Sequence, residues 1–184
     1  MRLPALALCL ALALSWASFA GAHQHHNHGD PEAPFFVVGN LDLDRYAGQW
    51  YEIARFPNRY QRNCHAIMAE YETRRDGNFD VRGVCPDRRP GRNGSSMEGV
   101  ARLDGPAELS IGLTSWMPLF RRTIFVLSIS EDYQVAVIGE PRRRYGWIMA
   151  RTPQITPAQF EQAAQVLTRN GYRVELLEQL VTID

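Results

Sequence analysis

The hydrophobic pattern between residues 48 and 151 is typical of short β-strands. Apolar and β-branched residues alternate with polar ones, and each run ends at turn-forming residues such as Gly, Pro, Asn or Asp. Eight such runs follow one another, at 48–56, 66–73, 79–84, 97–103, 109–114, 123–129, 134–138 and 145–150. Eight short strands at regular spacing favour a closed antiparallel barrel or a sandwich.

The connections between these runs alternate in kind. Three are short turns, at 76–78, 104–106 and 131–133. The others are longer, at 57–64, 86–95, 115–122 and 140–144. Alternate connections of an up-and-down barrel lie at the same end. We therefore expect the short turns to close the base and the long loops to surround the mouth.

The first run organises the rest of the chain. Polar residues 40–47 predict a short helical entry, and strand alternation then places four side chains on one face: Trp50, Glu52, Ala54 and Phe56. Gly48 lacks a Cβ and lets the backbone approach the indole of Trp50 closely. That indole needs a deep pocket and an acceptor for its N–H.

One amphipathic helix follows the last run. Thr156 is a helix N-cap, Pro157 suits the first helical position, and Gln159 completes a capping box. An apolar stripe then runs along the helix until Asn170-Gly171 ends it, and consists of Phe160, Ala163, Ala164 and Leu167. A single such helix after eight strands is expected to pack on the outer wall.

The amino terminus predicts export. Residues 1–22 combine Arg2, an apolar run and small residues at the end, as in a secretory signal peptide, and the run is too short to span a membrane. Cys9 lies in this run, but Leu8 is a poor residue to precede a lipid-anchored cysteine, so we expect no lipid anchor. Residues 23–36 are expected to form a disordered His-rich tail, and 37–184 one domain.

Two cysteines remain after the signal peptide, Cys64 and Cys85. The expected topology places Cys64 just before the second strand and Cys85 at the end of its hairpin partner. In an exported chain this favours one disulfide, worth about 3 kcal/mol, over two buried thiols.

The tail contains a candidate metal site, with the residues His23, His25, His26 and His28. Signal cleavage after Ala20 or Ala22 makes His23 or His25 the third mature residue. An amine and an imidazole so spaced bind Cu(II) or Ni(II) in a square plane. The alternative is a solvated tail whose histidines are incidental.

Two motifs resemble a known family. The block at 48–54, Gly-Gln-Trp-Tyr-Glu-Ile-Ala, preceded by Asp42 and Tyr46, is similar to the first signature of the lipocalins, in the branch of bacterial lipocalins and apolipoprotein D. The block at 145–153 resembles the last signature. The resemblance implies an all-β, eight-stranded antiparallel up-and-down barrel with one C-terminal α-helix outside and a short strand at 173–177.

The resemblance also implies roles for single residues. Gly48, Trp50 and Arg151 are structural signature residues, with Arg151 packed across Trp50 at the closed end in a cation–π contact worth up to about 2 kcal/mol. The ligand is expected to be a fatty acid or a lysophospholipid. We expect its cavity and mouth to involve Glu52, Phe56, Tyr60, Trp116, Phe120, Arg142, Arg143, Arg144 and Tyr145.

Arginines gather in or beside the long loops of a chain whose formal net charge is zero. They are Arg59, Arg62, Arg88, Arg89, Arg92, Arg121, Arg122, Arg142, Arg143 and Arg144. The mouth is therefore expected to carry a cationic rim for carboxylate or phosphate head groups, the alternative being ordinary solvated loop charge. The apolar loop at 115–120 is open to three interpretations: a lid, a membrane-surface contact, or barrel core.

The net charge and the positions of the histidines reduce the number of function classes that fit the sequence. A neutral balance does not indicate nucleic-acid binding. Outside the tail the only histidine is His65, so no Ser-His-Asp set can be assembled without the tail, and Glu52 is expected to be hydrogen-bonded to a floor tyrosine rather than catalytic. We expect an exported binding protein without cofactor, periplasmic or secreted, with outer-membrane association open, and monomeric or homodimeric. A Cu/Ni-binding envelope protein is the alternative, and an isomerase or hydrolase acting inside the cup is a third.

Overall fold

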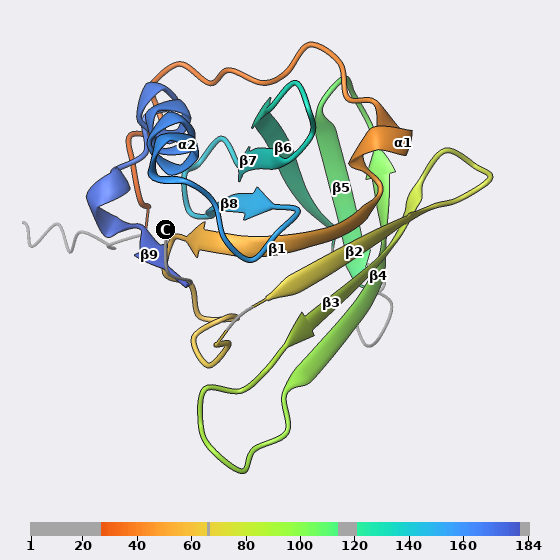
Figure 1. The fold of residues 1–184 in the computed structure, drawn as a ribbon. Coiled ribbons are helices and arrows are strands. Elements are labelled where there is room, and N and C mark those ends of the chain that lie inside the picture. The colour runs from red at the N-terminus through yellow and green to blue at the C-terminus, as the bar shows by residue number, and fades with distance from the viewer. Residues whose placement is uncertain (1–26, 66, 114–120, 181–184) are drawn as a thin grey trace, which may run out of the picture.

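The computed structural model describes residues 27–65, 67–113 and 121–180, and shows a β-barrel with one long helix outside it (Figure 1). The barrel strands are β1 (Gly48–Arg55), β2 (Met68–Thr73), β3 (Phe79–Cys85), β4 (Ser95–Leu103), β5 (Glu108–Leu113), β6 (Arg121–Ile129), β7 (Val135–Gly139) and β8 (Gly146–Ala150). A short helix, α1 (Leu43–Tyr46), precedes them. After them come α2 (Pro157–Arg169), a 3₁₀ turn (Val174–Leu176) and β9 (Glu178–Gln179).

The barrel is closed by its first strand. Consecutive strands from β2 to β8 pair antiparallel, and β1 pairs with both β8 and β2. This confirms the eight-stranded up-and-down barrel, with strand bounds close to those expected. The short strand expected at 173–177 is wrong, because these residues contain the 3₁₀ turn and pairing with β1 begins only at Glu178.

The floor is built around Trp50. Its side chain is fully buried, and its indole N–H donates to the backbone oxygen of Tyr46 at 2.8 Å. The Arg151 guanidinium carbon lies 3.8 Å from the centroid of the indole, as expected, and its nitrogens donate to the backbone oxygens of Arg45, Tyr46 and Gln49. Gly48 has a φ of 96°, a conformation that suits glycine.

A bulge in β1 changes which side chains face inward. Glu52 pairs with Met149, but Ala54 rather than Ile53 pairs with Ile148, so one residue is inserted into the strand. Beyond the bulge the two faces are exchanged. Arg55 consequently turns toward the interior.

The expectation that Phe56 lines the cavity is therefore wrong. Its ring lies outside the barrel wall in the cluster packed under α2, stacked on Tyr172 with centroids 5.0 Å apart and on His28 at 5.1 Å. The helix itself begins as predicted, since the capping box between Thr156 and Gln159 is present.

Residues 27–38 form a strap along the outside of the barrel, from the end of α2 toward α1 (Figure 1). The backbone of His28 bonds that of Arg143 and Arg173, and Val38 N–H donates to the oxygen of Val126 at 3.0 Å. The expected disorder is therefore wrong for residues 27–36. Residues 23–26 lie outside the described part of the chain.

Arg143 holds this strap in place. The residue is 1% exposed, and its guanidinium donates to the backbone oxygens of Pro31, Ala33, Pro34, Pro141 and Asn170. Its expected place on the solvated rim of the mouth is therefore wrong. A fork with several donors satisfies carbonyls from the strap and from the end of α2 at once.

Replacing Arg143 by Met should release the strap while the barrel stays closed. We expect a loss of roughly 3 kcal/mol in unfolding free energy, since several carbonyls lose a charged donor. Hydrogen exchange should accelerate at the amides of His28, Asp30 and Val38. R142M is the matched control, because Arg142 is exposed in the same turn, and it should change neither quantity. Equal effects of both variants would contradict the assignment.

Candidate functional site

The long connections that the structure describes lie at one end of the barrel, and a disulfide joins one of them to a neighbouring strand. Cys64, in the β1–β2 loop, is bonded to Cys85 at the end of β3, with Cα atoms 5.1 Å apart. The predicted disulfide is confirmed. The bond fixes the β1–β2 loop against the neighbouring hairpin at the mouth.

A buried polar network lies on the inner wall below this loop. Arg55 donates to Glu52 at 3.3 Å and to the backbone oxygens of Gln61 and Cys64 at 2.8 and 3.1 Å. The side chain of Gln61 donates to Glu52 at 2.6 Å and accepts from the indole N–H of Trp147 at 3.1 Å. The network therefore anchors the loop to β1 and β8.

Glu52 is 5% exposed, and this burial raises the pKa of its carboxyl to about 7, against the lowering effects of Arg55 and Gln61. Its hydrogen-bond partners are Gln61 and Arg55, so the expected bond to a floor tyrosine is wrong. The floor tyrosines, Tyr46 and Tyr71, pack edge-on to each other with centroids 5.2 Å apart. Because its oxygens are engaged by loop and strand, Glu52 fits a structural role better than a catalytic one.

An aromatic row continues from this network to the mouth. Trp147 stacks on Tyr145 with centroids 6.1 Å apart, and Tyr145 lies 6.4 Å from Tyr60. Tyr60 is 57% exposed in the β1–β2 loop. The guanidinium carbon of Arg122, at the start of β6, lies 3.9 Å from the centroid of Tyr145.

The arginines of the mouth differ in their surroundings. Arg142 is exposed, as are six others around the mouth: Arg59, Arg62, Arg88, Arg89, Arg92 and Arg121. Arg144 and Arg89 pair with the loop acids Glu140 and Asp87. With Arg143 buried elsewhere, the described mouth residues still carry more positive than negative charge.

The sequence alone missed the inward position of Arg55 and the contacts of Gln61 and Trp147. No sequence signal marks the bulge that turns Arg55 inward, and Gln61 acts from an irregular loop. The predicted residues Trp116 and Phe120 lie outside the described part of the chain, so the interpretations of the 115–120 loop stay predictions.

The histidine tail contributes one described side chain. His28 is 8% exposed, and its Nε2 lies 2.9 Å from the backbone oxygen of Pro57. His23, His25 and His26 lie outside the described residues. Within residues 27–65, 67–113 and 121–180, no group of three or more His, Cys, Asp or Glu side chains is arranged to hold a metal ion.

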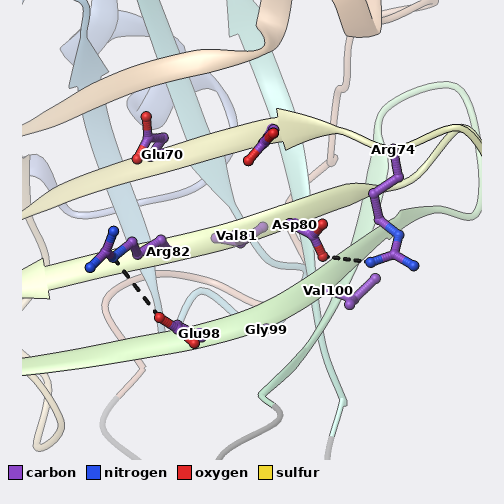
Figure 2. A pocket seen from close by; sticks show the side chains of 9 residues that line it. Glu70, Arg74, Asp80, Val81, Arg82, Glu98, Gly99 and Val100 are labelled. Atoms are coloured by element: carbon purple, nitrogen blue, oxygen red, sulfur yellow. Dashed lines mark hydrogen bonds and ion pairs between the residues drawn. The ribbon is translucent and has the colours of Figure 1, made fainter.

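An open groove of about 380 Å³ lies on the outer face of β2, β3 and β4 (Figure 2). Asp80 pairs with Arg74 at 2.6 Å, and Arg82 approaches Glu98 at 4.0 Å. These charged side chains alternate with residues that face the interior, so the groove is separate from the mouth.

In the part of the chain that the structure describes, no helix has the length and apolar character needed to cross a membrane.

The raised pKa of Glu52 predicts a pH-dependent stability. A carboxyl that binds its proton more tightly when folded makes the fold lose stability as pH rises from about 4.5 through 7, and the loss is complete above that range. E52Q cannot ionise, so it should match the wild type near pH 4 and exceed it near pH 8 by on the order of 3 kcal/mol.

Urea unfolding at several pH values measures this difference. The control is E70Q, which removes an exposed carboxyl from the outer face and should follow the wild-type pH profile. Parallel profiles for E52Q and the wild type would show that Glu52 does not ionise on the expected range.

The sequence of this chain matches a family model and several known proteins. A model of the lipocalin-like domain matches residues 41–182. The outer membrane lipoprotein Blc of Citrobacter freundii is 35% identical over 143 residues, which cover 77% of this chain and 79% of that protein. Temperature-induced lipocalin-1 of Arabidopsis thaliana is 35% identical over 150 residues, covering 77% and 79%. Apolipoprotein D of Bos taurus is 28% identical over 181 residues, covering 94% and 92%.

Solved structures agree on the fold. The cockroach allergen Per a 4 superposes with a TM-score of 0.63 at 17% identity, over 84% of this chain and 97% of the other. Insecticyanin of the tobacco hornworm Manduca sexta gives 0.63 at 16% identity, over 80% and 84%. The Trp50–Arg151 floor, the closed eight-stranded barrel and the family match agree, and the chain belongs to the lipocalins.

Proposed function

We propose that this lipocalin binds a fatty acid or a lysophospholipid and carries or stores it in the cell envelope or outside the cell. Binding of small hydrophobic ligands is the general activity of the family, whose members are generally not enzymes. The observation that supports the proposal is the inner wall, which is apolar and aromatic at the floor, carries one internally paired polar network below the β1–β2 loop, and has exposed arginines around its mouth.

The inner wall changes along the barrel axis. At the floor Trp50, Tyr46 and Phe79 are at most 1% exposed. Toward the mouth Trp147 is only partly buried, and Met97 is 41% exposed although the strand register places it on the inner face opposite Gly83. Apolar surface is therefore accessible from the open end, where an alkyl chain would enter.

The free energies of burying an alkyl chain and of forming an exposed ion pair indicate different roles for the inner wall and the arginine rim. Each methylene removed from water contributes about 0.8 kcal/mol, so a chain of about twelve carbons contributes on the order of 10 kcal/mol before opposing terms. An exposed ion pair with an arginine contributes about 0–1 kcal/mol. The wall then supplies affinity, and the rim selects and orients an anionic head group.

The relatives support a location outside the cytoplasm. The similar Citrobacter freundii and Escherichia coli proteins are outer membrane lipoproteins. The disulfide between Cys64 and Cys85 suits an oxidising compartment. Together with the signal-like residues 1–22, these features support a periplasmic or secreted protein.

Native mass spectrometry of the protein purified from its own host tests the proposal. We expect one fatty acid or lysophospholipid per chain, because the alkyl binding energy holds the ligand through purification. The same spectrum shows whether the chain is a monomer or a homodimer. A protein that carries no lipid and fails to bind added fatty acid or lysophospholipid would overturn the proposal.

Deleting residues 21–26 distinguishes the lipid-binding proposal from the metal-binding alternative. This deletion removes three histidines and spares His28, which packs against Phe56. Lipid binding should be unchanged. A Cu(II) or Ni(II) affinity that is lost with the deletion, in a protein that binds no lipid, would favour the alternative.

A further inference from the structure

Two guanidinium groups converge on one tyrosine at the mouth. The guanidinium carbons of Arg59 and Arg122 lie 4.8 and 5.2 Å from the ring centroid of Tyr60. Arg59 comes from the β1–β2 loop and Arg122 from the start of β6. Tyr145 lies under Arg122, so the aromatic row holds this cation in place.

Neither guanidinium has a carboxylate partner among the residues that the structure describes. The acids of the neighbouring loops are engaged elsewhere, since Glu140 pairs with Arg144 and Asp87 with Arg89. Aromatic faces attract cations but do not neutralise them. Two unneutralised guanidinium groups beside one ring favour an anion bound next to them, and their donors fit the oxygens of a carboxylate or phosphate.

The pKa of the Tyr60 phenol reflects the positive charge around it. The hydrogen bond that Arg59 donates to its hydroxyl, at 2.7 Å, lowers the pKa of the phenol, and the charges of Arg59 and Arg122 act in the same direction. The surroundings therefore stabilise negative charge at this point of the mouth.

Arg122 also connects the mouth to the interior. It pairs with Ile111 in the register of β5 and β6, and Ile124 and Val126 at alternate positions of β6 belong to the inner core. Its side chain therefore starts from the inner face. A molecule whose anion binds Arg122 has its tail directed toward the apolar wall.

We propose that Arg59 and Arg122, which both lie beside Tyr60, form the head-group site of this lipocalin and bind the oxyanion of a lipid whose tail enters the barrel. The site rests on the proposed lipid binding. It selects a carboxylate or phosphate head over a neutral one, and it distinguishes two of the ten mouth arginines from the others.

The test compares two lipids with the same tail, lauroyl lysophosphatidic acid and lauroyl monoacylglycerol, by calorimetric titration below the concentrations at which they aggregate. The wild type should bind the anionic lipid about tenfold more tightly. R122M and R59M should each reduce this preference to about threefold or less, because each weakens the binding of lysophosphatidic acid more than that of monoacylglycerol. R122K, which keeps the charge, should retain part of the preference.

R62M is the matched control, because Arg62 is an exposed arginine of the same loop, and R75M removes an exposed arginine at the closed end. Neither should change the preference by more than about twofold, the screening expected of distant exposed charges. An equal loss in R62M would overturn the site in favour of a diffuse rim effect. Urea unfolding verifies that each variant is folded.

The failures of the two proposals are distinguishable. If the wild type binds neither lipid, lipid binding itself fails. If it binds both equally, or if the preference persists in the double variant of Arg59 and Arg122, the head-group site is overturned and tail binding stands. Inorganic phosphate serves as the probe without a tail. Phosphate bound as tightly as lysophosphatidic acid would overturn the link between the site and the barrel.

Discussion

The structure depends on burying one indole at the closed end and satisfying its N–H there. Trp50 has no exposed surface, its nitrogen donates to the last residue of α1, and the guanidinium of Arg151 covers its face. Arg151 also donates to carbonyls at the end of α1, which a short helix leaves unpaired. Because β1 pairs with both β8 and β2, the strand that carries the indole is also the strand that closes the barrel.

Strand β1 also determines which side chains face inward near the mouth of the barrel. The bulge at Ile53 separates the register of the floor from that of the mouth, so Trp50 and Arg55 both face inward although they are five positions apart. In an unbroken strand, an odd spacing would place them on opposite faces. Below the bulge the interior is aromatic and buried. Above it the wall carries an ion pair that orders the β1–β2 loop, and its polar groups are satisfied by one another.

Much of this fold could be read from the residues. The strand runs and the capping box at Thr156 are local signals, and the pairing of Cys64 with Cys85 followed from the order of strands. The register beyond Ile53 could not be read, because an inserted residue changes which face later side chains take without altering composition. That single position explains why Phe56, expected in the cavity, lies outside the wall, and why Arg55 faces inward.

Other failures arise from contacts between distant segments. Residues 27–36 have the composition of a disordered tail, and contacts with distant segments order them, chiefly the guanidinium of Arg143 and backbone bonds with the residues that follow α2. Among the arginines, local sequence does not separate Arg143 from exposed Arg142. The distinction depends on backbone geometry, since Arg143 has a φ of 53° and its side chain reaches the strap.

The β1–β2 loop is fixed at both of its ends and at one point between them. Pro57 is bonded by His28 from the strap, Cys64 is covalently tied to β3, and Gln61 is anchored to the wall. An insertion at Arg62 and Asn63 would break the backbone bonds from Cys64 to Gln61 and from Arg88 to Asn63, so the length of this segment is constrained. Exchange of its exposed side chains breaks neither bond. Related barrels can therefore acquire new cargo preferences through such exchanges, for example at Arg59, while the scaffold beneath stays unchanged.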